Sequence, residues 1–287
     1  LSEGYFTCQD LGEQSLKGVA QPMRAYRVLG ASGALNRLDI VGARTFIPLV
    51  GREQEVSLLL ERWERVQDRQ GQVVLLSGEG GIGKSRLARV LREHVGTEAH
   101  TRIECHSSPY YQHTALYPII DLLQRTLQWQ PNDTPTVKLD KLEQMLCEYR
   151  LALQETVPLF ATLLSLPLSE ERSAPLPWTP QRQREQTLAS IVAMLLERAE
   201  RQAVLFILED LHWTDPSTLE LIDLLVDQAP TTALLLLLTC RPHFQPPWSN
   251  RSYLTQVTLH RLSRSQTEDM TRQVAGGKTL PAGIMQQ

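Results

Sequence analysis

The stretch Gly78–Ser85 reads Gly-Glu-Gly-Gly-Ile-Gly-Lys-Ser and matches G-x-x-x-x-G-K-[ST], the pattern of phosphate-binding loops. Before it, the short apolar run Val73–Ser77 predicts a buried strand, and after it Ser85–Val95 has apolar residues at helical spacing. Glycines let backbone N–H groups surround phosphate oxygens, and the N-terminus of the following helix adds partial positive charge. The order of strand, glycine loop and helix therefore predicts a site for ATP or GTP rather than an ordinary glycine turn.

Two side chains at the end of this loop have predicted roles in binding. Lys84 is expected to reach the β- and γ-phosphates, and the Ser85 hydroxyl is expected to bind Mg²⁺. The whole stretch is predicted to contact the nucleotide; its residues are Gly78, Glu79, Gly80, Gly81, Ile82, Gly83, Lys84, Ser85 and Arg86.

Composition and charge favour a globular domain and disfavour several other classes of protein. The chain has 287 residues, 42% of them hydrophobic, which is enough for one large α/β domain or two smaller ones. Its formal net charge of -3 gives no electrostatic basis for nonspecific binding to nucleic acid or to an anionic membrane. Apolar runs are far shorter than a spanning helix requires and no signal-peptide pattern opens the chain, so a cytoplasmic protein is expected.

The cysteines give little support for disulfides or for a structural metal. They are far apart and never form C-x-x-C, so free thiols are expected at Cys8, Cys105, Cys147 and Cys240. Cys105, His106 and His113 are close in sequence, but no fourth ligand stands at a spacing typical of zinc. A metal site at these three residues is therefore disfavoured.

Changes in composition divide the chain into four expected segments, residues 1–29, 30–47, 48–262 and 263–287. In the first segment, Asp10–Glu13 is predicted to turn and Pro22–Leu29 alternates like a strand. The second is rich in Gly, Ala, Ser and Asn and is expected to be a linker. The third is expected to be the nucleotide-binding core, and the fourth the start of a helical lid that is cut short.

The core alternates between strands and helices, which predicts an α/β P-loop fold with a five-stranded, mainly parallel sheet and helices on both faces. Besides the strand before the glycine loop, strands are expected at Thr101–Cys105, Ala203–Leu208, Ala233–Leu238 and Gln256–His260. Besides the helix after that loop, helices are expected at Glu53–Gln67, Tyr117–Trp129, Val137–Arg150, Gln181–Arg201, Ser217–Gln228 and Ser265–Val274. The middle helices form an insert that prolines such as Pro135 and Pro158 are expected to interrupt.

The strand Ala203–Leu208 ends in two carboxylates, Glu209 and Asp210. Parallel α/β sheets bind ligands at the carboxyl ends of their strands, so both acids are expected near the glycine loop. One would hold Mg²⁺, directly or through water, and the other would orient or deprotonate the attacking water. The alternative is a pair of acids favoured by the dipole of a following helix.

Three more polar residues are expected at the same edge of the sheet. Thr239 could hydrogen-bond the γ-phosphate and Arg241 could pair with phosphate or a carboxylate, although strand-end polarity without function explains both equally well. Asp215, followed by Pro216, is expected to cap the next helix, and its role can be purely structural.

Four segments together resemble a known family: Pro48–Glu53, the glycine loop, Leu208–Pro216 and Leu238–Pro242. They are similar to the STAND branch of AAA+-like ATPases, in particular to the Orc-like ATPase module of bacterial multidomain signalling proteins. The resemblance runs from about Pro48 to the end of the chain. It is the only basis for preferring adenine to guanine.

The resemblance also implies roles for individual residues. The backbone around Val50 and Gly51 would border the adenine, with Arg52 nearby, and Thr239 and Arg241 would occupy the sensor-one position.

One residue departs from the pattern of that family. Many relatives carry Asp where this chain has Glu209, so the resemblance leaves open which acid binds the metal and which activates water. His212 and Trp213 also belong to the family pattern, and Trp213 is expected to be a packing residue.

Residues 1–29 resemble the last strands of a class III adenylate or guanylate cyclase domain, through Leu11–Glu13, Leu16–Gly18 and Pro22–Leu29. This resemblance implies a parent chain in which a cyclase precedes the ATPase and helical repeats follow it. In that family the metal-binding residues of the cyclase lie upstream, so cyclase turnover is not expected here. The lid and winged-helix region of the ATPase would likewise lie beyond these residues.

These expectations describe an ATPase module that binds ATP and Mg²⁺, hydrolyses ATP slowly to ADP and acts as a nucleotide-dependent signalling switch. Two alternatives stay open: a regulatory module of an upstream cyclase, and a binding scaffold without hydrolysis. A small-molecule kinase is disfavoured, because no lid of closely spaced arginines is evident. No nucleic acid or membrane partner is expected, while the signal, the output partner and the oligomeric state stay open.

Overall fold

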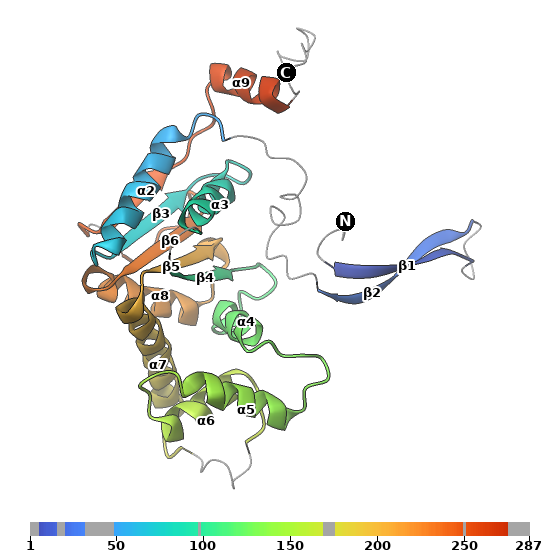
Figure 1. Ribbon diagram of the computed structural model, residues 1–287, viewed down its shortest axis with the longest axis vertical. Helices are drawn as coiled ribbons and strands as arrows, with labels where there is room; N and C mark the ends of the chain where they lie inside the picture. Colours follow the sequence, from blue (N-terminus) through green and yellow to red (C-terminus); the bar gives the residue numbers. More distant parts are fainter. Residues whose placement is uncertain are drawn as a thin grey trace. The chain divides into compact units, whose positions relative to one another are not determined.

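The computed structural model describes residues 6–15, 21–31, 49–96, 99–168, 176–248 and 251–274. The chain divides into two units, one of Arg52–Arg261 and the other of Leu1–Gly51 with Leu262–Gln287. The larger unit contains a five-stranded sheet and the smaller one a two-stranded sheet (Figure 1).

Five parallel strands form the centre of the larger unit. They are β3 (Gln72–Ser77), β4 (Thr101–His106), β5 (Val204–Glu209), β6 (Leu234–Cys240) and β7 (Leu254–Thr258). Their order is β4-β5-β6-β3-β7, and every neighbouring pair is parallel. All residues of β3, β5 and β6 are buried, as expected for apolar strands that are covered on both faces. The predicted five-stranded parallel sheet is confirmed.

The helices described in this unit are α2 (Glu53–Gln67), α3 (Lys84–Val95), α4 (Tyr117–Thr126), α5 (Pro135–Leu146), α6 (Leu153–Leu163), α7 (Pro180–Arg201), α8 (Pro216–Gln228) and the short 3-10 helices η1 (Leu211–Trp213) and η2 (Ala229–Thr231). Two prolines behave differently from the prediction. Pro135 opens α5 after the Thr134 cap, because proline suits the first helical turn. Pro158 lies buried inside α6, a helix that the sequence pattern does not reveal. None of the described helices is long and apolar enough to span a membrane.

The two-residue period of the strands separates two helical layers. Alternate strand residues such as Val73, Phe206 and Leu236 belong to one apolar core together with residues of α4, α7 and α8. The residues between them face the opposite side, where α2 and α3 pack against each other and against β6. Helices therefore flank the sheet on both faces.

The strand order brings together residues that are far apart in sequence. β4 follows β3 in the sequence but lies at one edge of the sheet, with β6 and β5 between the two strands. β7 lies on the other side of β3. The register aligns His106 with Glu209, and Leu76 with Thr239. The carboxyl ends of four strands therefore meet at one edge, where parallel α/β sheets bind ligands.

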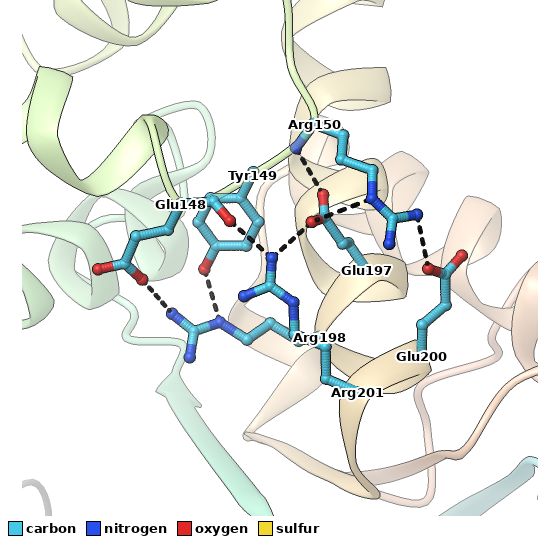
Figure 2. A network of polar contacts seen from close by, with 7 residues as sticks. All are labelled: Glu148, Tyr149, Arg150, Glu197, Arg198, Glu200 and Arg201. Carbon is cyan, nitrogen blue, oxygen red and sulfur yellow. Dashed lines mark hydrogen bonds and ion pairs between the residues drawn. The ribbon is translucent and has the colours of Figure 1, made fainter.

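The segment between α5 and α6 is joined to α7 by the polar network in Figure 2. Glu197 is buried and accepts hydrogen bonds from the Arg150 backbone at 2.8 Å and from the Arg201 side chain at 2.6 Å. These contacts hold the pKa of Glu197 below its usual value, and the hydrogen bond from the Arg150 backbone has the largest effect. Arg198 lies over the Tyr149 ring and donates to its hydroxyl at 2.7 Å. The helical insert is thereby tied to the helix that leads into β5.

The smaller unit contains an antiparallel hairpin of β1 (Phe6–Gln14) and β2 (Met23–Ala31). The predicted turn Asp10–Glu13 is wrong, because these residues lie inside β1. Asp10 Oδ1 accepts from the Gly12 N–H at 2.8 Å, Gly12 has a φ of +72°, and the register shifts at this point. The turn chemistry of Asp and Gly makes a bulge within the strand here. The strand predicted at Pro22–Leu29 corresponds to β2.

The same unit includes α9 (Arg264–Val274), in which the Gln266 amide donates to the Gly51 carbonyl at 3.5 Å. Most of the predicted linker, the segment Leu16–Gly18 and residues 275–287 lie outside the described residues. The four predicted segment boundaries therefore stay predictions.

Candidate functional site

The glycine loop between β3 and α3 has a backbone that suits glycine. Gly81 and Gly83 have φ values of +76° and +108°, in the region where other residues are strained. At Gly78, a Cβ atom would come within 2.8 Å of the Ile82 side chain. Glu79, Gly80 and Gly81 are exposed, Arg86 is partly buried, and Gly83 caps α3. The N–H groups of the first helical turn are thus directed at the loop, as an anion site requires.

Lys84 begins α3, and its side chain folds back over the loop. Its ammonium is buried and donates to the carbonyls of Gly78 at 2.7 Å and Glu79 at 2.9 Å. Burial lowers the pKa of Lys84, and the negative charge of Asp210 opposes this shift. The loop uses two of the three N–H donors of the ammonium, so a phosphate oxygen can take the third or replace a carbonyl.

Glu209 is the last residue of β5 and lies beside the start of α3. Its Oε2 accepts a hydrogen bond from the Ser85 hydroxyl, and its Oε1 lies 3.9 Å from His106 Nδ1. Burial raises the pKa of Glu209, while His106 and the Ser85 hydroxyl oppose this shift. The structure thus brings together two of the predicted Mg²⁺ ligands, Ser85 and Glu209.

Asp210 follows directly but lies in a different environment. Its backbone has a φ of +59°, and its N–H donates to Thr239 Oγ1 at 3.0 Å. The Asp210 side chain is 52% exposed, compared with 8% for that of Glu209. One acid is therefore buried against Ser85, and the other is open at the edge of the sheet.

Thr239 and Arg241 both lie near the glycine loop. Thr239 is buried in β6, where its hydroxyl supports the Asp210 backbone. Arg241 is exposed after β6, and its guanidinium lies 3.9 Å from the place that a Cβ on Gly80 would take. Their predicted contacts with phosphate stay predictions.

Arg52 is buried at the start of α2. Its guanidinium donates to the carbonyl of Ile82 at 3.4 Å and to the carbonyl of His260. It therefore ties the glycine loop to the segment after β7. Val50 and Gly51 belong to the smaller unit, so the adenine border predicted for these two residues and Arg52 stays a prediction.

Two histidines beside the acids are not assigned to the nucleotide site by the sequence. His106 is opposite Glu209 in the β4–β5 register, and His212 Nδ1 lies 4.0 Å from Asp210 Oδ1. Burial lowers the pKa of His212. The position of His106 at the end of a predicted strand indicates that it lies at the ligand-binding edge of the sheet. Only the strand order shows that its neighbour there is Glu209.

The oxygen atoms of Ser85 and Glu209, which are in contact, fit Mg²⁺, and Asp210 is the next carboxylate in the chain. This ion prefers oxygen ligands and typically takes only one or two protein carboxylates, with phosphate and water completing its octahedron. Within the described ranges, no group of three or more His, Cys, Asp or Glu side chains is arranged to hold a metal, Cys105, His106 and His113 included.

Asp215 caps α8, as predicted, and joins it to the start of α4. Its buried Oδ1 accepts from the N–H groups of Ser217, Thr218 and Leu116 at 2.9, 3.0 and 3.1 Å.

We expect Asp215→Ala to lower the free energy of unfolding by about 2–4 kcal/mol, because it removes a cap and leaves buried donors unpaired. Urea denaturation measures this, with the exposed Asp227→Ala on the same helix as control. A loss no larger than that of the control would contradict the structural role.

Comparisons with known proteins concern the same part of the chain. A family model described as AAA ATPase domain matches residues 48–238, more than half of the sequence. The uncharacterized protein R02095 of Rhizobium meliloti (strain 1021) is 26% identical over 257 residues, which are 89% of this chain and 24% of that protein. The chain thus spans about a quarter of the length of this relative.

Two solved structures show a more distant likeness. Drosophila ORC bound to DNA has 12% identity and a TM-score of 0.42, over 77% of this chain and 45% of that one. A DNA replication initiation factor has 11% identity and a TM-score of 0.40, over 84% of this chain and 56% of that one. The family model covers the glycine loop, the acidic pair and most of the parallel sheet. The chain belongs to the AAA ATPase domain family.

Proposed function

We propose that this AAA-type ATPase domain binds ATP with Mg²⁺ at the glycine loop and hydrolyses it slowly, as a signalling switch. The observation that carries the proposal is the hydrogen bond from the Ser85 hydroxyl to Glu209, next to the buried Lys84. This bond joins a hydroxyl and a carboxylate at the start of α3, and Lys84 is the first residue of the same helix. A nucleoside triphosphate with its metal requires this combination.

The residues divide into two groups. Lys84 and the N–H groups of the loop would hold the phosphates, and Ser85 with Glu209 would hold Mg²⁺. Bound Mg²⁺ would neutralise part of the negative charge on the β- and γ-phosphates. Asp210 would orient or deprotonate the attacking water, because its carboxylate is the exposed one. Glu209 thus faces the metal and Asp210 faces the water in this proposal.

The contacts around the loop favour a switch. Lys84 donates to two backbone carbonyls and Ser85 donates to Glu209, whereas phosphate and metal would need the same groups. Nucleotide binding would therefore exchange these contacts. Thr239 in β6 accepts a hydrogen bond from the Asp210 backbone. A movement of the acidic pair would therefore be transmitted to β6. Thr239 and Arg241 would sense the γ-phosphate from that strand.

We further propose that the parent protein is a cytoplasmic, multidomain regulator of the STAND type, with a cyclase domain before this module and helical repeats after it. In the β1–β2 hairpin, Tyr26, Val28 and Leu29 are more than half exposed. Apolar residues on an isolated pair of strands are typical of the edge of a larger sheet. The sequence before Leu1 tests this: metal-binding aspartates of a cyclase would support it, and an unrelated sequence would contradict it.

Calorimetric titration of the folded protein with ATP and GTP, with and without Mg²⁺, tests the function of the site. We expect Mg²⁺-dependent binding of ATP in preference to GTP. We expect phosphate release, followed in the same samples, at a rate below the roughly 1 s⁻¹ at the low end of ordinary enzymes. Binding without any release would favour the scaffold alternative, and no binding to folded protein would contradict the nucleotide site.

A further inference from the structure

His212 has a buried side chain. Its side chain is 2% exposed, and neither ring nitrogen has a hydrogen-bond partner among the residues that the structure describes. The ring packs against those of Trp213 and His243, with centroids 5.0 and 6.0 Å away. An imidazole carries at least one N–H donor, and leaving a buried donor unpaired is unfavourable. An acceptor that approaches in another state of the site would remove this cost.

The Asp210 carboxylate is an acceptor that lies near this ring. Its Oδ1 lies 4.0 Å from His212 Nδ1, about 1 Å beyond a normal hydrogen bond. The backbone of Asp210 is held in place, because its N–H is bonded to Thr239. Its side chain is 52% exposed, so it can change rotamer. Rotation of this side chain is therefore the movement that we expect to shorten the distance between the two atoms.

Nucleotide binding supplies a reason for the rotation. In the structure the charge of Asp210 acts both on the Lys84 ammonium and on His212. A phosphate group bound by Lys84 would offset that attraction and would repel the Asp210 carboxylate, since like charges at short distance disfavour each other. The rotamer of Asp210 that points its carboxylate toward the His212 ring would then be favoured.

We propose that His212 is a positioning residue for hydrolysis, whose Nδ1–H donates to the Asp210 carboxylate once nucleotide is bound. This hydrogen bond holds one carboxylate oxygen and leaves the other for the attacking water. The inference rests on the proposed function and adds to it a residue outside the glycine loop and the acidic pair. A histidine that only fills space would need no acceptor at Nδ1.

Three substitutions separate positioning from packing. His212→Phe keeps a ring without a donor, His212→Asn keeps an amide N–H near the Nδ1 position, and His212→Gln places the amide near the Nε2 position. We expect ATP affinity, measured by calorimetry, to change by less than about 3-fold in all three. We expect kcat for phosphate release to fall about 10-fold in the first and third, the effect of one lost hydrogen bond, and to be largely retained in His212→Asn.

A second measurement does not depend on turnover. In ¹⁵N-labelled protein, histidine side-chain spectra report which ring nitrogen carries the proton, and the His212 signals are identified by their loss in His212→Phe. We expect the His212 Nδ1–H proton to move downfield when a non-hydrolysable ATP analogue with Mg²⁺ is added. This movement should be absent in Asp210→Ala, which lacks the acceptor.

The outcomes distinguish this inference from the function on which it rests. Wild-type rates in all three variants, rescue by His212→Gln in place of His212→Asn, or an unmoved Nδ1–H proton would each overturn it while ATP binding stays intact. Failure of the wild-type protein to bind ATP would overturn the proposed function and the inference together. If His212→Phe does not fold, the comparison of His212→Asn with His212→Gln still decides, because both keep a polar amide.

Discussion

Lys84→Ala is expected to weaken ATP binding by about 10- to 100-fold. The lost interaction is a charge-assisted hydrogen bond to the phosphates, which contributes about 1.5–3 kcal/mol. The same ammonium also donates to the carbonyls of Gly78 and Glu79. The variant therefore loses the phosphate contact together with the two bonds that hold this side chain against the loop.

Calorimetry with ATP and Mg²⁺ measures this effect, and circular dichroism shows whether the variant is folded. Arg89→Ala is the matched control, because it removes one positive charge from the same helix at a residue paired with Glu93. We expect it to leave ATP affinity within about 2-fold of wild type, because neither Arg89 nor Glu93 belongs to the predicted phosphate-binding stretch. Unaltered affinity in Lys84→Ala would contradict the assignment of the phosphate-binding loop.

The elements around the glycine loop are predictable because their signals are local. α2 spans the predicted Glu53–Gln67, and β3 begins one residue before the predicted start. α6 shows where local signals fail. Pro158 disfavours a helix by propensity, but it is buried among the apolar residues of the insert, and tertiary packing outweighs that preference.

The site is only partly predictable for a related reason. Motifs and strand ends predict that Lys84, Ser85 and the two acids gather at one edge of the sheet. Sequence does not show which strands are neighbours, so the alignment of His106 with Glu209 appears only in the structure. The burial of His212, whose ring has no hydrogen-bond partner within the described ranges, likewise depends on packing between segments.

Asp210→Asn is expected to slow ATP hydrolysis by about 100-fold or more while ATP affinity changes little, because an amide cannot take a proton from water. The hydrogen bond to Thr239 comes from the Asp210 backbone, so the substitution leaves it in place. Glu209→Gln is expected to act through the metal instead. A neutral amide oxygen is a weaker ligand for Mg²⁺ than a carboxylate, so hydrolysis should require a higher Mg²⁺ concentration.

Phosphate release at saturating ATP, measured against Mg²⁺ concentration, separates the two roles. Asp210→Asn should lower the maximal rate with an unchanged Mg²⁺ midpoint, whereas Glu209→Gln should move the midpoint upward. Asp227→Asn, at an exposed carboxylate of α8, should match wild type. The reverse pattern would place the metal on Asp210 and the water on Glu209. The Mg²⁺ midpoint therefore decides which acid binds the metal. The size of the loss in rate does not decide it, because removing either carboxylate slows hydrolysis.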